Sequence, residues 1–87
     1  MKLGDRLIGE RGALRVILQV QDENIAVTLW DMAAKDPIGK VLATAEAEID
    51  DNFAKAKEQA ILLIGRELNP YSEEDFDRIR EDISWMP

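Results

Sequence analysis

The sequence predicts a small α+β domain in which a three-stranded antiparallel sheet, arranged as a meander, is followed by two α-helices packed on one face of the sheet. Three observations lead to this prediction. Two runs of alternating apolar and polar residues flank a short polar turn, a third such run follows a Pro-containing turn, and the last part of the chain has helical periodicity. A chain of 87 residues has room for one domain.

The predicted sheet occupies residues 13–49. Residues 14–21 alternate with a period of two, and residues 25–32 are rich in β-branched and aromatic types, so the polar break between them indicates a hairpin. A third strand is expected over residues 40–49. Its alanines would let a helix approach the sheet closely, but alanine also favours helix, so residues 42–48 could instead extend the helix that follows.

The first twelve residues give a weaker signal. Gly4, Gly9 and Gly12 interrupt the segment, and neither a helix nor a strand is indicated. We therefore expect residues 1–12 to be irregular.

The main helix is predicted over residues 50–69. Asp50 or Asp51 is a suitable N-cap, and Pro70 disfavours a helical conformation at the preceding residue. Leu62 falls among charged residues, away from the expected core. The apolar face of this helix comprises Phe53, Ala56, Ala60, Leu63, Ile64 and Leu68.

An acidic second helix is predicted over residues 72–84. Ser72 is its N-cap candidate, Asp75 stands at the capping-box position, and Tyr71 and Phe76 have the spacing of a hydrophobic staple. The segment that follows, Trp85-Met86-Pro87, could close the core or form a short apolar tail.

The formal charge of −7 is unevenly distributed. The first twenty residues hold four bases and two acids, whereas six acids and two bases lie after residue 69. An acidic surface repels phosphate, so direct nucleic-acid binding and acidic membranes are disfavoured, and a partner with a basic surface is favoured. The charged N-terminus and the absence of a long apolar run indicate a cytoplasmic protein without a signal peptide or membrane span.

The chain carries little catalytic chemistry. It has no His and no Cys, and no nucleotide-binding or nucleophile-elbow motif occurs. We therefore predict no enzyme activity, no catalytic residue and no cofactor. Glu46, Glu48, Asp50 and Asp51 could in principle hold a divalent cation, but a solvated strand edge running into a helix cap is the favoured interpretation, and no metal site is predicted.

Two surfaces are candidates for partner binding. The sheet face opposite the helices should carry Ile17, Thr28, Trp30, Met32 and Leu42, which is unusually apolar for a solvent-facing surface. This face could be an interface, or the N-terminal segment or the last helix could cover it. The second surface is the acidic helix, with Glu73, Glu74, Asp77 and Glu81 as candidate contacts.

These observations predict a small acidic protein-binding module, an inhibitor, antitoxin or phage- or plasmid-type regulator that covers a basic partner protein. One alternative is a structural homodimer paired through the Trp30 face, and another is a carboxylate-dependent metal enzyme. The order of elements over residues 14–68 resembles, in shape only, double-stranded-RNA-binding folds and the partial domain of HicB-type antitoxins, and implies no function.

Overall fold

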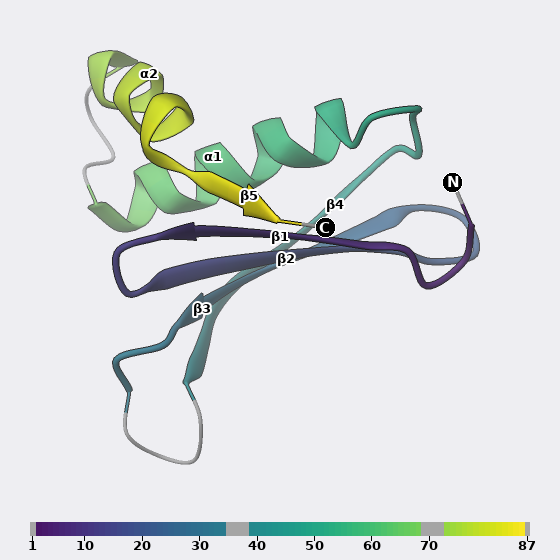
Figure 1. The fold of residues 1–87 in the computed structure, drawn as a ribbon, viewed down its shortest axis with the longest axis horizontal. Helices are drawn as coiled ribbons and strands as arrows, with labels where there is room; N and C mark the ends of the chain where they lie inside the picture. Colours follow the sequence, from purple (N-terminus) through teal and green to yellow (C-terminus); the bar gives the residue numbers. More distant parts are fainter. Residues whose placement is uncertain (1, 35–38, 69–72, 87) are drawn as a thin grey trace.

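Five antiparallel strands and two helices make up the described part of the chain (Figure 1). The structure is a computed structural model that describes residues 2–34, 39–68 and 73–86. The strand order across the sheet is β4-β3-β2-β1-β5. In chain order the elements are β1 (Arg6–Arg11), β2 (Leu14–Val20), β3 (Ile25–Asp31), β4 (Lys40–Ala47), α1 (Ala54–Leu68), α2 (Glu73–Asp82) and β5 (Ser84–Met86).

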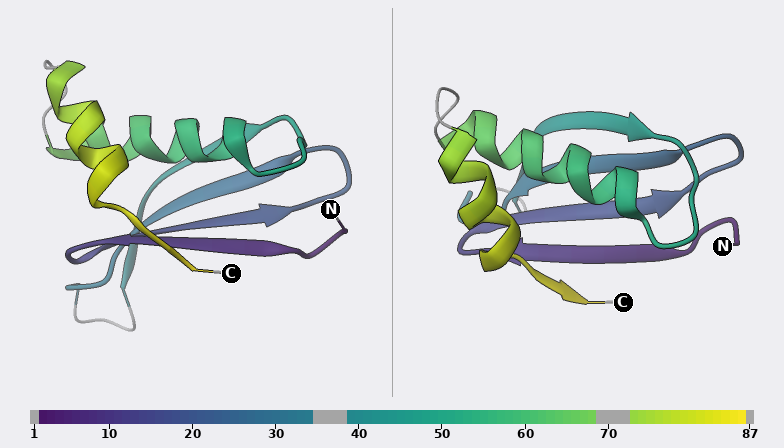
Figure 2. Two further views of the ribbon diagram at one scale, coloured as in Figure 1. Left: turned by 45° about the horizontal axis from the view of Figure 1, so that its top comes forward. Right: turned by 90° about the horizontal axis from the view of Figure 1, so that it is seen from above.

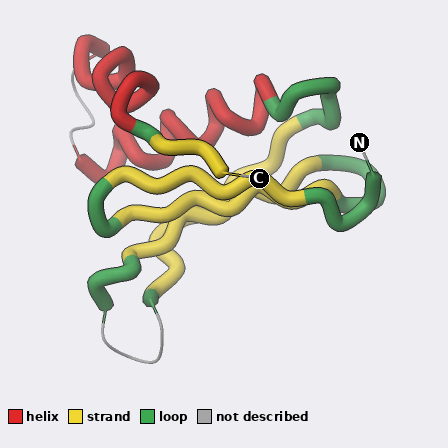
Figure 3. The backbone as a smooth tube through the Cα atoms, viewed as in Figure 1, coloured by secondary structure: helices red, strands yellow, loops and turns green. Residues whose placement is uncertain are grey.

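The helices form a second layer on one face of the sheet, as expected (Figures 2 and 3). The inward side chains of β2 and β3 alternate with outward ones, which fits the period of two in their sequences. These inward side chains meet α1 and the end of α2 in one core. Its fully buried large members are Val16, Leu18, Ile25, Val27, Leu29, Ile64 and Ile79.

The prediction of a three-stranded sheet is wrong, because β1 and β5 add a strand each beside β2. Residues 6–11, which we expected to be irregular, pair along their whole length with β2 through a turn at Gly12, which has a φ of 60°. Gly9 weakened the strand signal, but its missing side chain makes room for another residue. A Cβ atom on Gly9 would lie 2.7 Å from the Trp85 ring, which occupies the space above this strand.

The segment after the last helix forms β5, which pairs with β1. Trp85 lies opposite Gly9 and packs against the core, so of the two expected roles of this terminal segment, core closure is the one observed. Met86 remains exposed on the other face.

Residues 40–47 form a strand, so the alternative in which residues 42–48 extend the main helix is excluded. A register irregularity between Leu29 and Trp30 of β3 shifts the pairing with β4, so that Trp30 lies opposite Val41. Leu42 consequently packs against the core. Val41, and not Leu42, is therefore the partner of Trp30 in the register.

Helix α1 begins later than expected because its cap lies four residues before the first helical residue. Asp50 accepts hydrogen bonds from the backbone N–H groups of Ala54 (3.1 Å) and Lys55 (2.9 Å). The predicted apolar face is buried at Ala56, Ala60, Leu63 and Ile64, while Leu68 is 48% exposed. Leu62 is exposed, as predicted.

Helix α2 packs on α1 at a glycine. A Cβ atom on Gly65 would overlap the Phe76 ring, so only a residue without a side chain allows this approach. The proposed cap at Ser72 and the contact from Tyr71 lie outside the described residues. None of the described helices is long and apolar enough to cross a membrane.

Candidate functional site

The sheet face opposite the helices is the main candidate surface. Both described helices lie on the other side, and no described segment crosses this face (Figures 1 and 2). The two segments considered as possible covers lie elsewhere, because β1 joins the sheet as a strand and α2 packs on α1. We call this surface the open face, and its apolar and hydroxyl residues are Ile8, Ile17, Ala26, Thr28, Trp30, Val41, Thr44, Ser84 and Met86.

The strand register places these side chains in two neighbouring rows. One row runs from Met86 through Ile8 and Ile17 to Thr28, and the next contains Trp30 beside Val41. Val41 and Met86 are 43% and 42% exposed, and the residues between them are partly buried by their neighbours. The open face therefore carries an apolar side chain on each of the five strands, and we call Met86, Ile8, Ile17, Trp30 and Val41 the apolar strip.

Trp30 is the largest residue of the open face. Its side chain is half-buried, and its indole Nε1 is buried without a hydrogen-bond acceptor in the described part of the chain. Tryptophan is enriched among residues that dominate binding energy at protein interfaces.

The charged residues beside Trp30 neutralise one another. Arg15, which is opposite Trp30 in the register, donates hydrogen bonds from Nε (3.2 Å) and Nη2 (2.9 Å) to Oε1 of Glu10 on β1. Arg6 and Glu46 lie at the far end of the same face and also carry opposite charges. The open face thus has little net charge, in contrast to the whole chain at −7.

The structure brings together some of the predicted site residues and separates others. Ile17, Thr28 and Trp30 share the open face, and Met32 lies half-buried at its end, beside Gly39. Leu42 is partly buried and packs against the core, and Val41 is the residue that lies opposite Trp30.

Sequence reasoning missed Ile8, Val41 and Met86. Ile8 and Met86 lie on strands that were not predicted, so their face was undefined. The available signal for β1 was the pair Gly12-Ala13 between two runs with apolar residues, which is typical of a two-residue hairpin turn.

The acidic helix lies on the opposite side of the sheet from the open face (Figure 1). Asp77 and Glu81 are exposed there, and Asp77 accepts a hydrogen bond of 2.6 Å from Arg80. The side chains of Glu73 and Glu74 lie outside what the structure describes. The two candidate surfaces are therefore separate, and one flat partner surface cannot contact both.

The acids around the start of α1 serve the helix and its first lysine. Asp50 caps the helix, and Glu48 accepts a hydrogen bond of 2.6 Å from Lys55. That bond lowers the pKa of Glu48 and raises the pKa of Lys55, while the backbone hydrogen bond from Lys55 lowers the pKa of Asp50. Within the described residues, no group of three or more acidic side chains could hold a metal ion.

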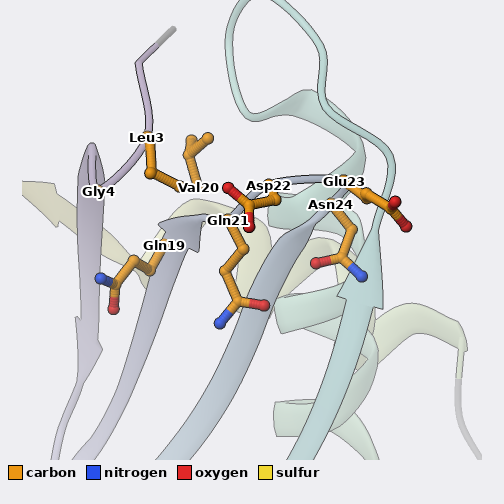
Figure 4. Close-up of a pocket in the computed structure, with 8 residues that line it drawn as sticks. All are labelled: Leu3, Gly4, Gln19, Val20, Gln21, Asp22, Glu23 and Asn24. Carbon is orange, nitrogen blue, oxygen red and sulfur yellow. The ribbon is translucent and has the colours of Figure 1, made fainter.

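A hollow of about 580 Å³ lies between the N-terminal segment and the β2–β3 turn (Figure 4). Leu3 and Val20 supply its apolar contacts, and the amides and acids of residues 21–24 supply its polar groups. It is a shallow depression in the surface, with no histidine, thiol or hydroxyl nucleophile among its lining residues.

Comparisons with protein-family models, curated proteins and solved structures find no match. The function must therefore be inferred from the residues and geometry described above.

Proposed function

We propose that this protein is a non-catalytic protein-binding module that contacts its partner through the open face, with Trp30 at the centre of the contact. The partner we propose carries a net basic charge, and the role is that of an inhibitor or regulator that covers part of the partner's surface. The observation that supports this proposal most strongly is the apolar strip from Met86 to Val41 on a sheet face without a covering layer.

The strip has the composition of an interface centre. Aromatic, methionine and branched aliphatic side chains lie together, while the nearby charges of Arg15 and Glu10 are already paired and need no partner. A partner that covers the strip would remove exposed apolar surface from water at a gain of about 25 cal/mol per Å².

The acidic charge is assigned to the association step of the same interaction, in which the partner approaches. Exposed acidic side chains lie on α2, on the other side of the sheet from the open face. Charges outside a contact mainly raise the rate of association with an oppositely charged protein and contribute less to the lifetime of the complex. We propose that the acidity steers a basic partner and that the open face holds it.

Affinity capture with matched bait variants tests the proposal. The baits are the wild-type chain, Trp30→Ser on the open face, and the double variant Asp77→Lys/Glu81→Lys on α2. We expect a specific protein that is retained by the wild type and by the α2 variant at equilibrium, and whose retention falls at least about tenfold with Trp30→Ser. Circular dichroism of each bait checks that it is folded, which we expect because all three positions lie outside the buried core.

Three results would contradict the proposal. The wild type could retain no protein above the blank resin, or Trp30→Ser could retain the same proteins as the wild type. If the bait retains only further copies of its own chain, and Trp30→Ser abolishes this, the open face is a homodimer interface instead.

A further inference from the structure

The outer edge of β4 is the second unpartnered feature of the sheet. β4 is the terminal strand in the sheet order and, with eight residues, the longest of the five. The opposite edge is the three-residue β5. No described segment lies alongside the outer edge of β4 (Figure 2).

The sequence of β4 lacks the usual protection of an edge strand. Between Lys40 and Glu46 there is no charge and no proline, and the register irregularity lies near the beginning of the strand. The regular part from Ala43 to Ala47 pairs on one side with β3 only. Its outward N–H and C=O groups are thus available to another strand.

The helix layer also leaves space beside this edge. Ala45 and Ala47 point towards α1 yet remain only half-buried, because their side chains are small and α1 does not cover them fully. A hollow of about 590 Å³ lies between the end of β4 and α1, and it is lined by Glu46, Ala47, Glu48, Ala54, Lys55, Glu58 and Gln59. Side chains of an added strand would fit over these alanines.

We propose that the occupant of this edge is β4 of a second copy of the same chain, paired antiparallel. The strand begins with the exposed cation Lys40, and the exposed anion Glu46 lies near its other end. Antiparallel pairing brings the cationic end of one copy beside the anionic end of the other, twice per dimer. Parallel pairing would place like charges together.

The proposed dimer joins two five-stranded sheets into one continuous sheet. Antiparallel pairing at an edge relates the copies by a two-fold axis perpendicular to the sheet. Both helix layers then lie on one side and both open faces on the other. The dimer leaves the open face free and does not depend on the function proposed for it.

Charge exchange at the ends of β4 tests the proposal. Sedimentation equilibrium from micromolar to millimolar concentration gives the dimer dissociation constant of the wild type, Lys40→Glu, Glu46→Lys and the double variant. We expect each single variant to weaken the dimer about tenfold, because it makes both ends of the strand alike in charge. The double variant restores opposite ends and should restore the dimer.

Arg6→Glu is the matched control, because it makes the same change in charge at an exposed strand start on β1. It should leave the dissociation constant unchanged. A chain that stays monomeric up to millimolar concentration would overturn the proposal. A dimer that neither Lys40→Glu nor Glu46→Lys weakens would also overturn it, and so would a dimer that Arg6→Glu weakens as much as these variants do. A dimer that is lost only with Trp30→Ser would be assigned to the open face.

Discussion

At the scale of single residues, Gly9 and Trp85 act as one unit. The two lie opposite each other in the pairing of β1 with β5, and the indole ring fills the space that a side chain at position 9 would take. The side chain of Lys57 on α1 lies over the Trp85 ring, with Nζ 5.5 Å from the ring centre. One tryptophan thus connects the last strand, the first strand and the main helix.

Gly9→Ala should destabilise the protein by about 1–3 kcal/mol, because the new methyl group would overlap the Trp85 ring and the Ile83 side chain. Urea unfolding of Gly9→Ala, Trp85→Ala and the double variant measures the coupling. In the Trp85→Ala background, Gly9→Ala should cost much less, since most of the obstruction is gone. If Gly9→Ala lowered the unfolding free energy equally with Trp85 present and absent, the steric conflict between position 9 and Trp85 would be contradicted.

Glu58 gives a pH-dependent contribution with a defined sign. Arg80 donates hydrogen bonds from Nε (3.0 Å) and Nη2 (2.9 Å) to its two carboxylate oxygens, which lowers the pKa of Glu58 below its ordinary value of 4.5. A carboxyl group whose pKa is lower in the folded state stabilises that state above its unfolded pKa. This stability is lost as the pH falls through the lower folded value.

We therefore expect the wild type to be more stable than Glu58→Gln at pH 6, and the difference in unfolding free energy to shrink as the pH is lowered below the ordinary value of 4.5. Urea unfolding at a series of pH values measures this difference. Taking the difference between two variants removes the effect of protonating the other acids. A difference that is constant or grows towards low pH would contradict the role of the Arg80 contact.

At the scale of elements, α2 is attached to its neighbours by a small apolar contact and several ion pairs. Phe76 packs on Gly65, Arg80 binds Glu58 of α1, and Arg11 of β1 lies 3.4 Å from Asp82. The ion pairs are largely exposed, so each contributes little by itself. The close approach at Gly65 is therefore the contact on which the position of α2 mainly depends.

Gly65→Ala should displace α2, because its methyl group would overlap Phe76. We expect a loss of about 1–3 kcal/mol, together with faster amide hydrogen exchange in α2 and β5. The amides of β2 and β3, which lie in the centre of the sheet, should keep their relative protection. Leu62→Ala on the exposed face of α1 serves as the control. Unchanged exchange in α2 would show that the helix docks by other contacts.

The elements that were predicted from the sequence carry their own local signals. β2 and β3 have the period of two and a polar turn, and α1 has a capping aspartate and an apolar stripe. β1 has only the turn signal of Gly12-Ala13, and Gly9 weakens its strand pattern because the space that a side chain would take there is filled by Trp85 of β5. A contact between residues 76 positions apart leaves no trace in local periodicity.

The residues of the open face could be predicted on β2 and β3 but not on β4. The face of Ile17, Thr28 and Trp30 follows directly from alternation along β2 and β3. The exchange of Leu42 for Val41 depends on a register irregularity between β3 and β4, which alternation within a single strand cannot reveal.

At the scale of the whole molecule, apolar and acidic surfaces are segregated. The open face has paired charges and an apolar strip, whereas the exposed acids of α2 lie in the helix layer on the other side of the sheet. If a basic partner binds the open face, added salt should lower the association rate strongly and the dissociation rate little, because the steering charges lie outside the contact. Surface plasmon resonance with the captured partner measures both rates. A salt effect mainly on dissociation would place the acids inside the contact.

Site-specific photo-crosslinking in cells tests the open face most directly. A benzoylphenylalanine replaces Thr28 on the open face in one variant and Asp77 on α2 in another. We predict a discrete adduct with a different protein from position 28 and none from position 77. An adduct from position 77 alone, or no adduct from either position, would contradict binding through the open face. An adduct from position 28 with a second copy of the chain would instead identify that face as a homodimer interface.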